Sequence, residues 1–268
     1  MGISAVFRTC AAAGAILLLS GCGAFDEVPR GTTSLLQALV PQTSPAEAAD
    51  MAVDPYSAER RYRGTTLLSN AEFGGGPVYL ELYLDAVRDA DPGVRAAGVR
   101  AVGRHGEPEH ALVVVALLKD EDRMVRVSAA RALQRLHNPA VVPALLDAIR
   151  EDREPDADVR VAAADALGQY PEPRVVQGLI AALADSRLAV NHAVRGSLVT
   201  LTGQDLGVDR RAWLNWHDRA PDLFAGRQPY VYPAFRRDKR IVEYLPFVPP
   251  PPNEVPSAPV GVDPTGGN

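Results

Sequence analysis

DPGVRAAGVRAVG, at residues 91–103, is the stretch that decides the fold of this 268-residue chain. It returns in altered form as VRVSAARAL at residues 125–133 and as VRVAAADALG at residues 159–168. Val94 and Val102 lie eight positions apart on one face of a helix, and most residues between them are small. Small side chains let neighbouring helices approach closely. The stretch therefore predicts Ala-rich helices that stack on one another.

The spacing of prolines extends this pattern to pairs of helices. Four prolines, each ahead of an apolar helical pattern, recur at intervals of 31, 31 and 34 residues: Pro77, Pro108, Pro139 and Pro173. Proline suits the first helical turn because its missing amide needs no partner there. The second helices of the pairs are expected at residues 94–105, 125–137, 159–170 and 188–201. Because no pair can bury its apolar face alone, we expect the array to fold as one unit.

This pattern resembles HEAT repeats of the type also found in phycobilisome lyases, over residues 77–202. The resemblance implies a ladder in which an acid and a base link successive repeats. Its members here are Asp89, Arg95, Asp120, Arg126, Glu154, Arg160 and Asp185. The fourth repeat departs from the pattern because Asn191 stands where the others have arginine.

The flanking segments complete the predicted architecture. We expect an N-terminal cap segment at residues 56–76 and a capping helix with Trp213 and Trp216 within residues 203–226. Residues 227–268 are interpreted as an extended, Pro-rich tail, because consecutive prolines favour a polyproline conformation. The fold class is therefore all-α, a short α-solenoid of about four HEAT-like helix pairs with an N-terminal cap, a C-terminal capping helix and extended tails.

The N-terminus is typical of an exported protein. Arg8 precedes an apolar run of about ten residues, which is too short to span a bilayer and is typical of a signal peptide at residues 1–21. Leu19-Ser20-Gly21-Cys22 resembles the bacterial lipobox, which implies a lipid on Cys22. Residues 22–55 are then interpreted as a flexible tether. We expect an envelope location on the extracytoplasmic face, and Gly23 favours the outer membrane over the inner.

Composition and motifs argue against most chemistry. A net charge of −5 gives no signal for nucleic acid. Cys10 leaves with the signal peptide and Cys22 carries lipid, so the mature chain offers no thiol. The five histidines have no metal-ligand spacing, and no nucleophile or phosphate-loop motif is present. We therefore predict no catalytic residue, no metal and no cofactor.

The second helices carry the candidate binding residues. Five and nine positions after the ladder arginine, the first two repeats have Arg100, Arg104, Arg131 and Arg135. The third has Asp165 and Gln169 at these positions. A basic half-groove on a concave face suits an acidic protein partner or another anionic surface. A solvated Arg-rich helix face explains the same residues equally well.

Three functions follow from these features. The leading hypothesis is a membrane-anchored, non-catalytic scaffold or adaptor that binds a protein partner on the concave face. The alternative is a cofactor-handling or lyase-like protein, implied by the resemblance to bilin lyase repeats. A third is a structural envelope component whose Pro-rich tail spans a gap.

Overall fold

The computed structural model describes residues 43–71, 73–233, 238, 240, 244 and 256–262. The chain divides into two compact units. Of the first, residues 1–43 and 236–253, only Thr43, Asp238, Arg240 and Tyr244 are described. The second, residues 44–235 and 254–268, contains all the helices discussed below. Among the described residues, no helix is both long enough and apolar enough to cross a membrane.

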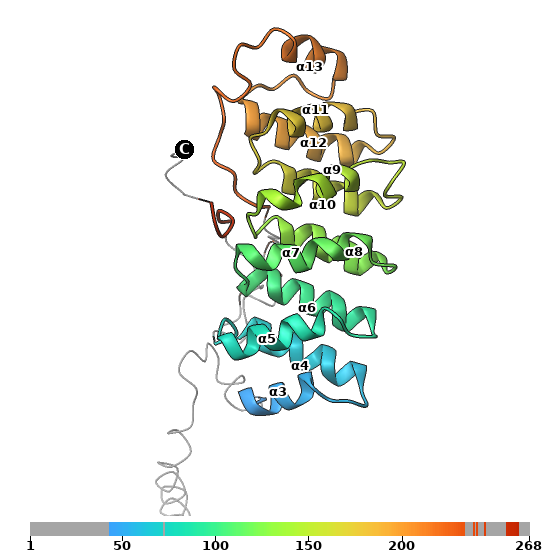
Figure 1. Ribbon diagram of the computed structural model, residues 1–268, viewed down its shortest axis with the longest axis vertical. Helices are drawn as coiled ribbons and strands as arrows, with labels where there is room; N and C mark the ends of the chain where they lie inside the picture. Colours follow the sequence, from blue (N-terminus) through green and yellow to red (C-terminus); the bar gives the residue numbers. More distant parts are fainter. Residues whose placement is uncertain are drawn as a thin grey trace, which may run out of the picture. The chain divides into compact units, whose positions relative to one another are not determined.

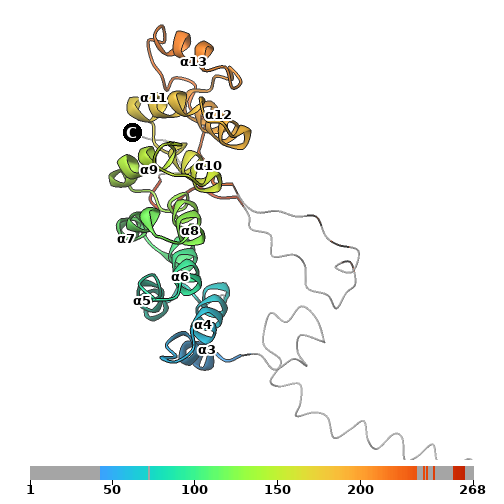
Figure 2. The same cartoon turned by 90° about the vertical axis from the view of Figure 1, so that its right-hand side faces the viewer.

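The helices of this unit form two columns (Figures 1 and 2). One column contains the first helices of the pairs: α3 (Pro45–Ala52), α5 (Pro77–Ala86), α7 (Ala111–Val114), α9 (Val142–Ala148) and α11 (Pro173–Ala182). The other contains the second helices: α4 (Ala58–Asn70), α6 (Pro92–His105), α8 (Arg123–Leu133), α10 (Ala157–Leu167) and α12 (Leu188–Thr202). Short 3-10 helices extend the first column at η1 (Pro108–His110), η2 (Val115–Lys119) and η3 (Pro139–Val141), and α13 (Arg210–His217) follows α12. The predicted all-α solenoid is confirmed.

Local sequence explains where these helices begin. Proline occupies the first turn of α3, α5, α6 and α11. Asp91, Asp122 and Asp156 cap α6, α8 and α10, because each side chain accepts a backbone amide of the first turn. The repeat therefore encodes these three second helices through an aspartate that precedes each of them directly, whereas Ser57 caps α4 and the N-cap of α12 is Arg187.

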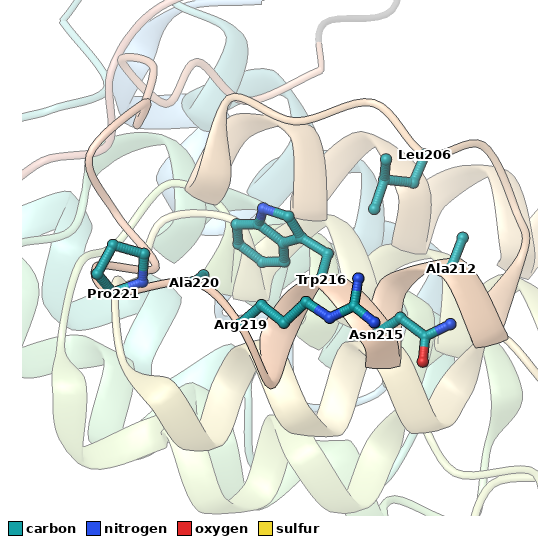
Figure 3. Close-up of a pocket in the computed structure, with 7 residues that line it drawn as sticks. All are labelled: Leu206, Ala212, Asn215, Trp216, Arg219, Ala220 and Pro221. Atoms are coloured by element: carbon teal, nitrogen blue, oxygen red, sulfur yellow. The ribbon is translucent and has the colours of Figure 1, made fainter.

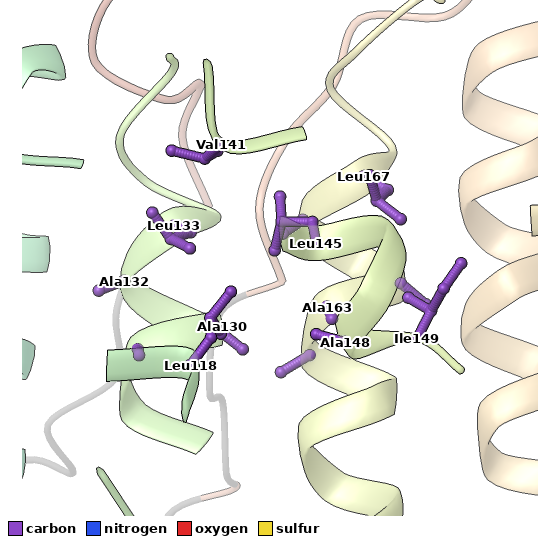
Figure 4. Close-up of a cluster of buried hydrophobic side chains, with 14 of the residues drawn as sticks. Leu118, Ala130, Ala132, Leu133, Val141, Leu145, Ala148, Ile149, Ala163 and Leu167 are labelled. Atoms are coloured by element: carbon purple, nitrogen blue, oxygen red, sulfur yellow. The ribbon is translucent and has the colours of Figure 1, made fainter. Parts of the chain in front are cut away.

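One stripe of each first helix builds the core. The residue seven positions after the N-cap is completely buried in four repeats: Tyr83, Val114, Leu145 and Leu179, each 0% exposed. Figure 4 shows Leu145 with Leu133, Val141 and Leu167, where side chains of adjacent repeats meet. Between second helices the approach is closer still, because a Cβ on Gly103 would lie 2.7 Å from the Ala132 Cβ. The core is continuous from repeat to repeat.

Within the described residues the stack contains five complete pairs, compared with the predicted number of about four. Residues 45–52 form α3 within the segment interpreted as tether, and α4 occupies most of the predicted cap segment. Ser44 caps α3, and Gly64 allows α4 to approach α3 so closely that a Cβ there would clash with the backbone of Ala52. The solenoid therefore begins about thirty residues earlier than predicted.

The predicted tail also needs correction. Residues 226–233 and 256–262, here named the strap, run back along the column of second helices (Figure 2). The Gln228 amide donates to the Thr200 carbonyl at 2.8 Å, and the Val260 amide donates to the Arg135 carbonyl at 2.8 Å. Backbone groups of the helix ends thus hold an extended segment in place. Cys22 lies outside the described residues, and so does the rest of the predicted tail apart from Asp238, Arg240 and Tyr244.

Candidate protein-binding surface

An ion-pair ladder fixes the relative positions of the second helices. The guanidinium of each repeat pairs with the acid of the next: Arg95 with Asp120 at 2.9 Å, Arg126 with Glu154 at 2.9 Å and Arg160 with Asp185 at 2.7 Å. Each acid also accepts a backbone amide two residues further on, as Asp185 does from Arg187 at 2.7 Å. The structure therefore brings all seven sequence-predicted ladder residues together, with Asp89 joined as described next.

The ladder has one ion pair more than the sequence suggested at its N-terminal end, and no ion pair at Asn191 at its C-terminal end. Arg61 of α4 donates two hydrogen bonds to Asp89, at 2.6 and 2.8 Å. The hydrogen bond from Arg61 lowers the pKa of the Asp89 carboxyl. At the other end Asn191 reaches only the Asp185 carbonyl, at 3.2 Å, and its own buried Oδ1 accepts no hydrogen bond within the described part of the chain.

A stripe of residues on the second helices faces away from the first helices. It lies five and nine positions after the ladder residue, and we name it the second-helix face. Its members are Thr66, Asn70, Arg100, Arg104, Arg131, Arg135, Asp165, Gln169, Gly196 and Thr200. All six residues predicted to bind a partner belong to it.

The N-terminal part of this face is open and basic. Its three exposed arginines, together with Tyr62, which lies one position after Arg61, form what we name the open surface: Tyr62, Arg100, Arg104 and Arg131. All four side chains are exposed. Arg104 is oriented by the Ser69 carbonyl at 3.1 Å and by Asn70. Burial lowers the pKa of Arg100; Tyr62 opposes this effect and Arg131 adds to it. The three arginines make this surface positive, which favours an anionic partner.

The C-terminal part of the face is covered by the strap. The guanidinium carbon of Arg135 lies 4.7 Å from the ring centroid of Tyr232, a cation–π contact. Gln169 is only 2% exposed and donates to the Leu133 carbonyl at 2.9 Å, while its Oε1 lies 3.0 Å from His137 Nδ1. The prediction that Gln169 meets a partner is therefore wrong, because this side chain ties α10 to the end of α8.

Asp165 lies beneath the strap beside Tyr230. Burial raises the pKa of Asp165 to about 6, with Arg131 opposing the effect. Tyr230 packs on Gly168, where an added Cβ would lie 3.2 Å from its ring. The Tyr230 hydroxyl is buried and has no hydrogen-bond partner among the described residues. Asp165 is thus part of the contact between strap and stack rather than a free position of the face.

The remaining candidates serve the packing. Trp213 is completely buried and donates to the Gly207 carbonyl at 2.9 Å, and Trp216 meets it edge to face at 5.8 Å. His105 Nε2 lies 2.8 Å from the Ser69 carbonyl oxygen. Within the described residues, no three His, Cys, Asp or Glu side chains converge as a metal site.

Sequence reasoning missed two parts of this surface. Tyr62 was placed in a cap segment, although Pro45, Asp54 and Arg61 repeat the proline, acid and base of the later pairs. The strap carries no repeat signal, since backbone groups make most of its hydrogen bonds.

Comparisons with known proteins agree with the repeat assignment. Residues 80–157 match the family model of HEAT repeats, and residues 159–185 match that of the PBS lyase HEAT-like repeat. No curated protein sequence matches the chain. Among solved structures, the complex of CpcE and CpcF of phycocyanin lyase from Nostoc sp. PCC7120 is similar, with 22% identity and a TM-score of 0.40. The match covers 60% of this chain and 77% of that one. The chain therefore contains HEAT-like repeats of the PBS lyase type.

Proposed function

We propose that this protein is a lipid-anchored, extracytoplasmic adaptor that binds an acidic segment of a partner protein on the open surface. The observation that carries the proposal is that Tyr62 of α4, Arg100 and Arg104 of α6 and Arg131 of α8 are all exposed on successive second helices. Arginine and tyrosine are enriched where protein interfaces gain most of their binding energy. The ladder supports this role, because it holds α4, α6 and α8 in one arrangement and so presents these side chains in fixed positions.

The anchor in this proposal is Cys22. Its support is the sequence Leu19-Ser20-Gly21-Cys22 after a short apolar run. Several acyl chains on one cysteine would give stable membrane attachment without a spanning helix. The adaptor would then act at the membrane surface and have no catalytic step of its own.

Charge reversal on the open surface tests the binding site. The full chain would be crosslinked in native membranes and purified, as wild type and as the double variant Arg100→Glu, Arg131→Glu. The proposal expects a protein partner with the wild type and at least about tenfold less of it with the variant, since like charges across an interface are repulsive. The matched control is Arg153→Glu, at an exposed position of the loop after α9. Equal recovery with wild type and double variant, or no partner at all, would refute the proposal.

A lyase-like or cofactor-handling activity is the second candidate. It is favoured by the match of residues 159–185 to the PBS lyase HEAT-like repeat. The purified chain would be mixed with a linear tetrapyrrole and passed through a sizing column. Stoichiometric visible absorbance in the protein peak would favour this candidate over the adaptor, and a colourless protein peak would count against it.

A further inference from the structure

The segment after α12 begins a sixth repeat. In three repeats the ladder acid follows the N-cap of the first helix by 13 residues, as Asp185 follows Glu172. Asp222 follows Asp209, the N-cap of α13, by the same 13 residues. Asp222 also accepts the amide two residues further on, from Phe224 at 2.8 Å, as the ladder acids do. By position and by hydrogen bond, α13 is therefore a first helix.

In the part of the chain that the structure describes, no second helix forms for this sixth repeat. The residues that would form it contain Gly226, Pro229 and Pro233, and proline within a helix removes a hydrogen bond and clashes with the preceding turn. The chain instead leaves as the strap. Its first attachment is the hydrogen bond from Gln228 to the Thr200 carbonyl. Trp216 lies seven residues after the N-cap, at the position that four earlier repeats bury completely.

An open pocket of about 450 Å³ lies where the missing helix would pack. Its lining includes Ala212, Trp216, Arg219 and Ala220, which lie three, seven, ten and eleven positions after the N-cap (Figure 3). In complete repeats the corresponding stripe of the first helix packs against the second helix. In the pair α5 and α6, for example, Val87 lies eleven positions after the N-cap of α5, and a Cβ added to Gly98 of α6 would lie 2.8 Å from the Val87 amide nitrogen. The pocket therefore continues the contact that each complete repeat makes internally.

We propose that this pocket binds an amphipathic helix of a partner protein, which completes the sixth repeat. The side of that helix that contacts the pocket carries small apolar residues. They correspond to Gly98, Ala129 and Ala163 on this chain's own second helices. An acidic residue lies beside that stripe and meets Arg219. This guanidinium lines the pocket and forms no ion pair within the described part of the chain. Helix-in-groove recognition of this kind needs only a few anchors spaced by one helical turn.

The described part of a second copy of this chain does not fit the same place. The pocket calls for a second helix, whereas the first described helix at the N-terminal end of another stack is α3, a first helix. The inference is independent of the proposed function, because it concerns residues 209–222 and not the open surface.

The test uses a synthetic peptide of residues 156–168, the α10 segment, held helical by a staple away from its small residues. The peptide contains no tryptophan, so the emission of Trp213 and Trp216 in the full chain reports on the pocket alone. We expect a saturable change in emission below about 1 mM peptide. In Ala212→Arg the larger side chain fills the pocket, and arginine is a good helix former, so α13 should be retained. This variant should bind the peptide at least about tenfold more weakly. Leu214→Ala, at an exposed position of α13, should leave binding unchanged.

Charge exchange tests the role of Arg219. Arg219→Glu should weaken binding of the peptide about threefold. A peptide in which Asp158 and Asp165 are both replaced by arginine should bind the Arg219→Glu variant with the original affinity. No saturable change up to about 1 mM, or equal binding to wild type and Ala212→Arg, would overturn the proposal.

Discussion

Removing the most buried rung of the ladder should destabilise the protein more than removing any other. In Arg160→Met the guanidinium is lost while an unbranched apolar stem is kept. The side chains of Arg160 and Asp185 are each 2% exposed, and Arg160 donates to Asp185 at 2.7 and 3.2 Å and to the Glu154 carbonyl at 2.7 Å. The substitution leaves a buried carboxylate without its cation. We therefore expect a loss of about 3–5 kcal/mol in the free energy of unfolding.

The rest of the ladder supplies graded controls. The side chains of Arg61 and Asp89 are 19% and 12% exposed, so water can solvate the abandoned carboxylate. Arg61→Met should cost only about 1–2 kcal/mol. Adding Asp185→Leu to Arg160→Met removes the unpaired charge and should recover most of the loss. Recovery should fall short by about 1 kcal/mol, because Asp185 also accepts the Arg187 amide.

Urea denaturation followed by circular dichroism and by tryptophan emission measures these differences. Coincidence of the two signals shows that the stack unfolds as one unit and that the free energies can be compared. Equal losses for Arg160→Met and Arg61→Met would refute the reasoning, since it makes burial the source of the cost. So would a loss below about 1 kcal/mol for Arg160→Met.

Three further predictions follow from the strap and the anchor. Gly203 has φ +70° and a Cβ there would clash with the Gly226 carbonyl, whereas Gly207 has φ +65° and open space around it. Gly203→Ala should therefore lower the melting temperature and speed hydrogen exchange in residues 226–233 more than Gly207→Ala, which carries only the backbone strain; equal effects would remove the steric argument. Because burial raises the pKa of Asp165 to about 6, the Asp165 carboxyl binds a proton more tightly when the strap is docked over it than when the strap is released. Docking should therefore strengthen by about 1–2 kcal/mol as the pH falls from 7 towards 4. Proteolysis within residues 226–233 should slow over this range in wild type but not in Asp165→Asn, and a parallel pH dependence in the variant would contradict the assignment. Cys22→Ser should move the protein from the membrane fraction to the soluble fraction, and unchanged fractionation would exclude the lipid anchor.

The repeat core could be predicted because its determinants are local and recur. The second helices α6, α8 and α10 each have an aspartate before the first turn, a Val-Arg pair and small residues at fixed positions, so three copies align without any structure. The first pair escaped notice because α3 has only eight residues and because Asp54 and Arg61 are seven positions apart instead of six. A search anchored on proline spacing would have found it, since Pro45 precedes Pro77 by 32 residues.

The binding surface was only half predictable, for a physical reason. Helical spacing places Arg100 and Gln169 on the same face, yet only Arg100 reaches solvent there. What buries Gln169 is its contact with His137, 32 residues earlier, under a strap that approaches from the C-terminus. The strap binds through the Thr200 and Arg135 carbonyls, which every residue type possesses. Such contacts leave no trace in residue patterns.

Photo-crosslinking from the open surface tests the adaptor function most directly. A benzophenone amino acid would replace Tyr62 in one variant and Val78, exposed on the first-helix side, in another. Illumination of native membranes should yield a discrete protein adduct from position 62 and none from position 78. The adduct should disappear when Arg100 and Arg131 are reversed to glutamate. No adduct from position 62, or the same adduct from both positions, would contradict the claim that this surface binds the partner.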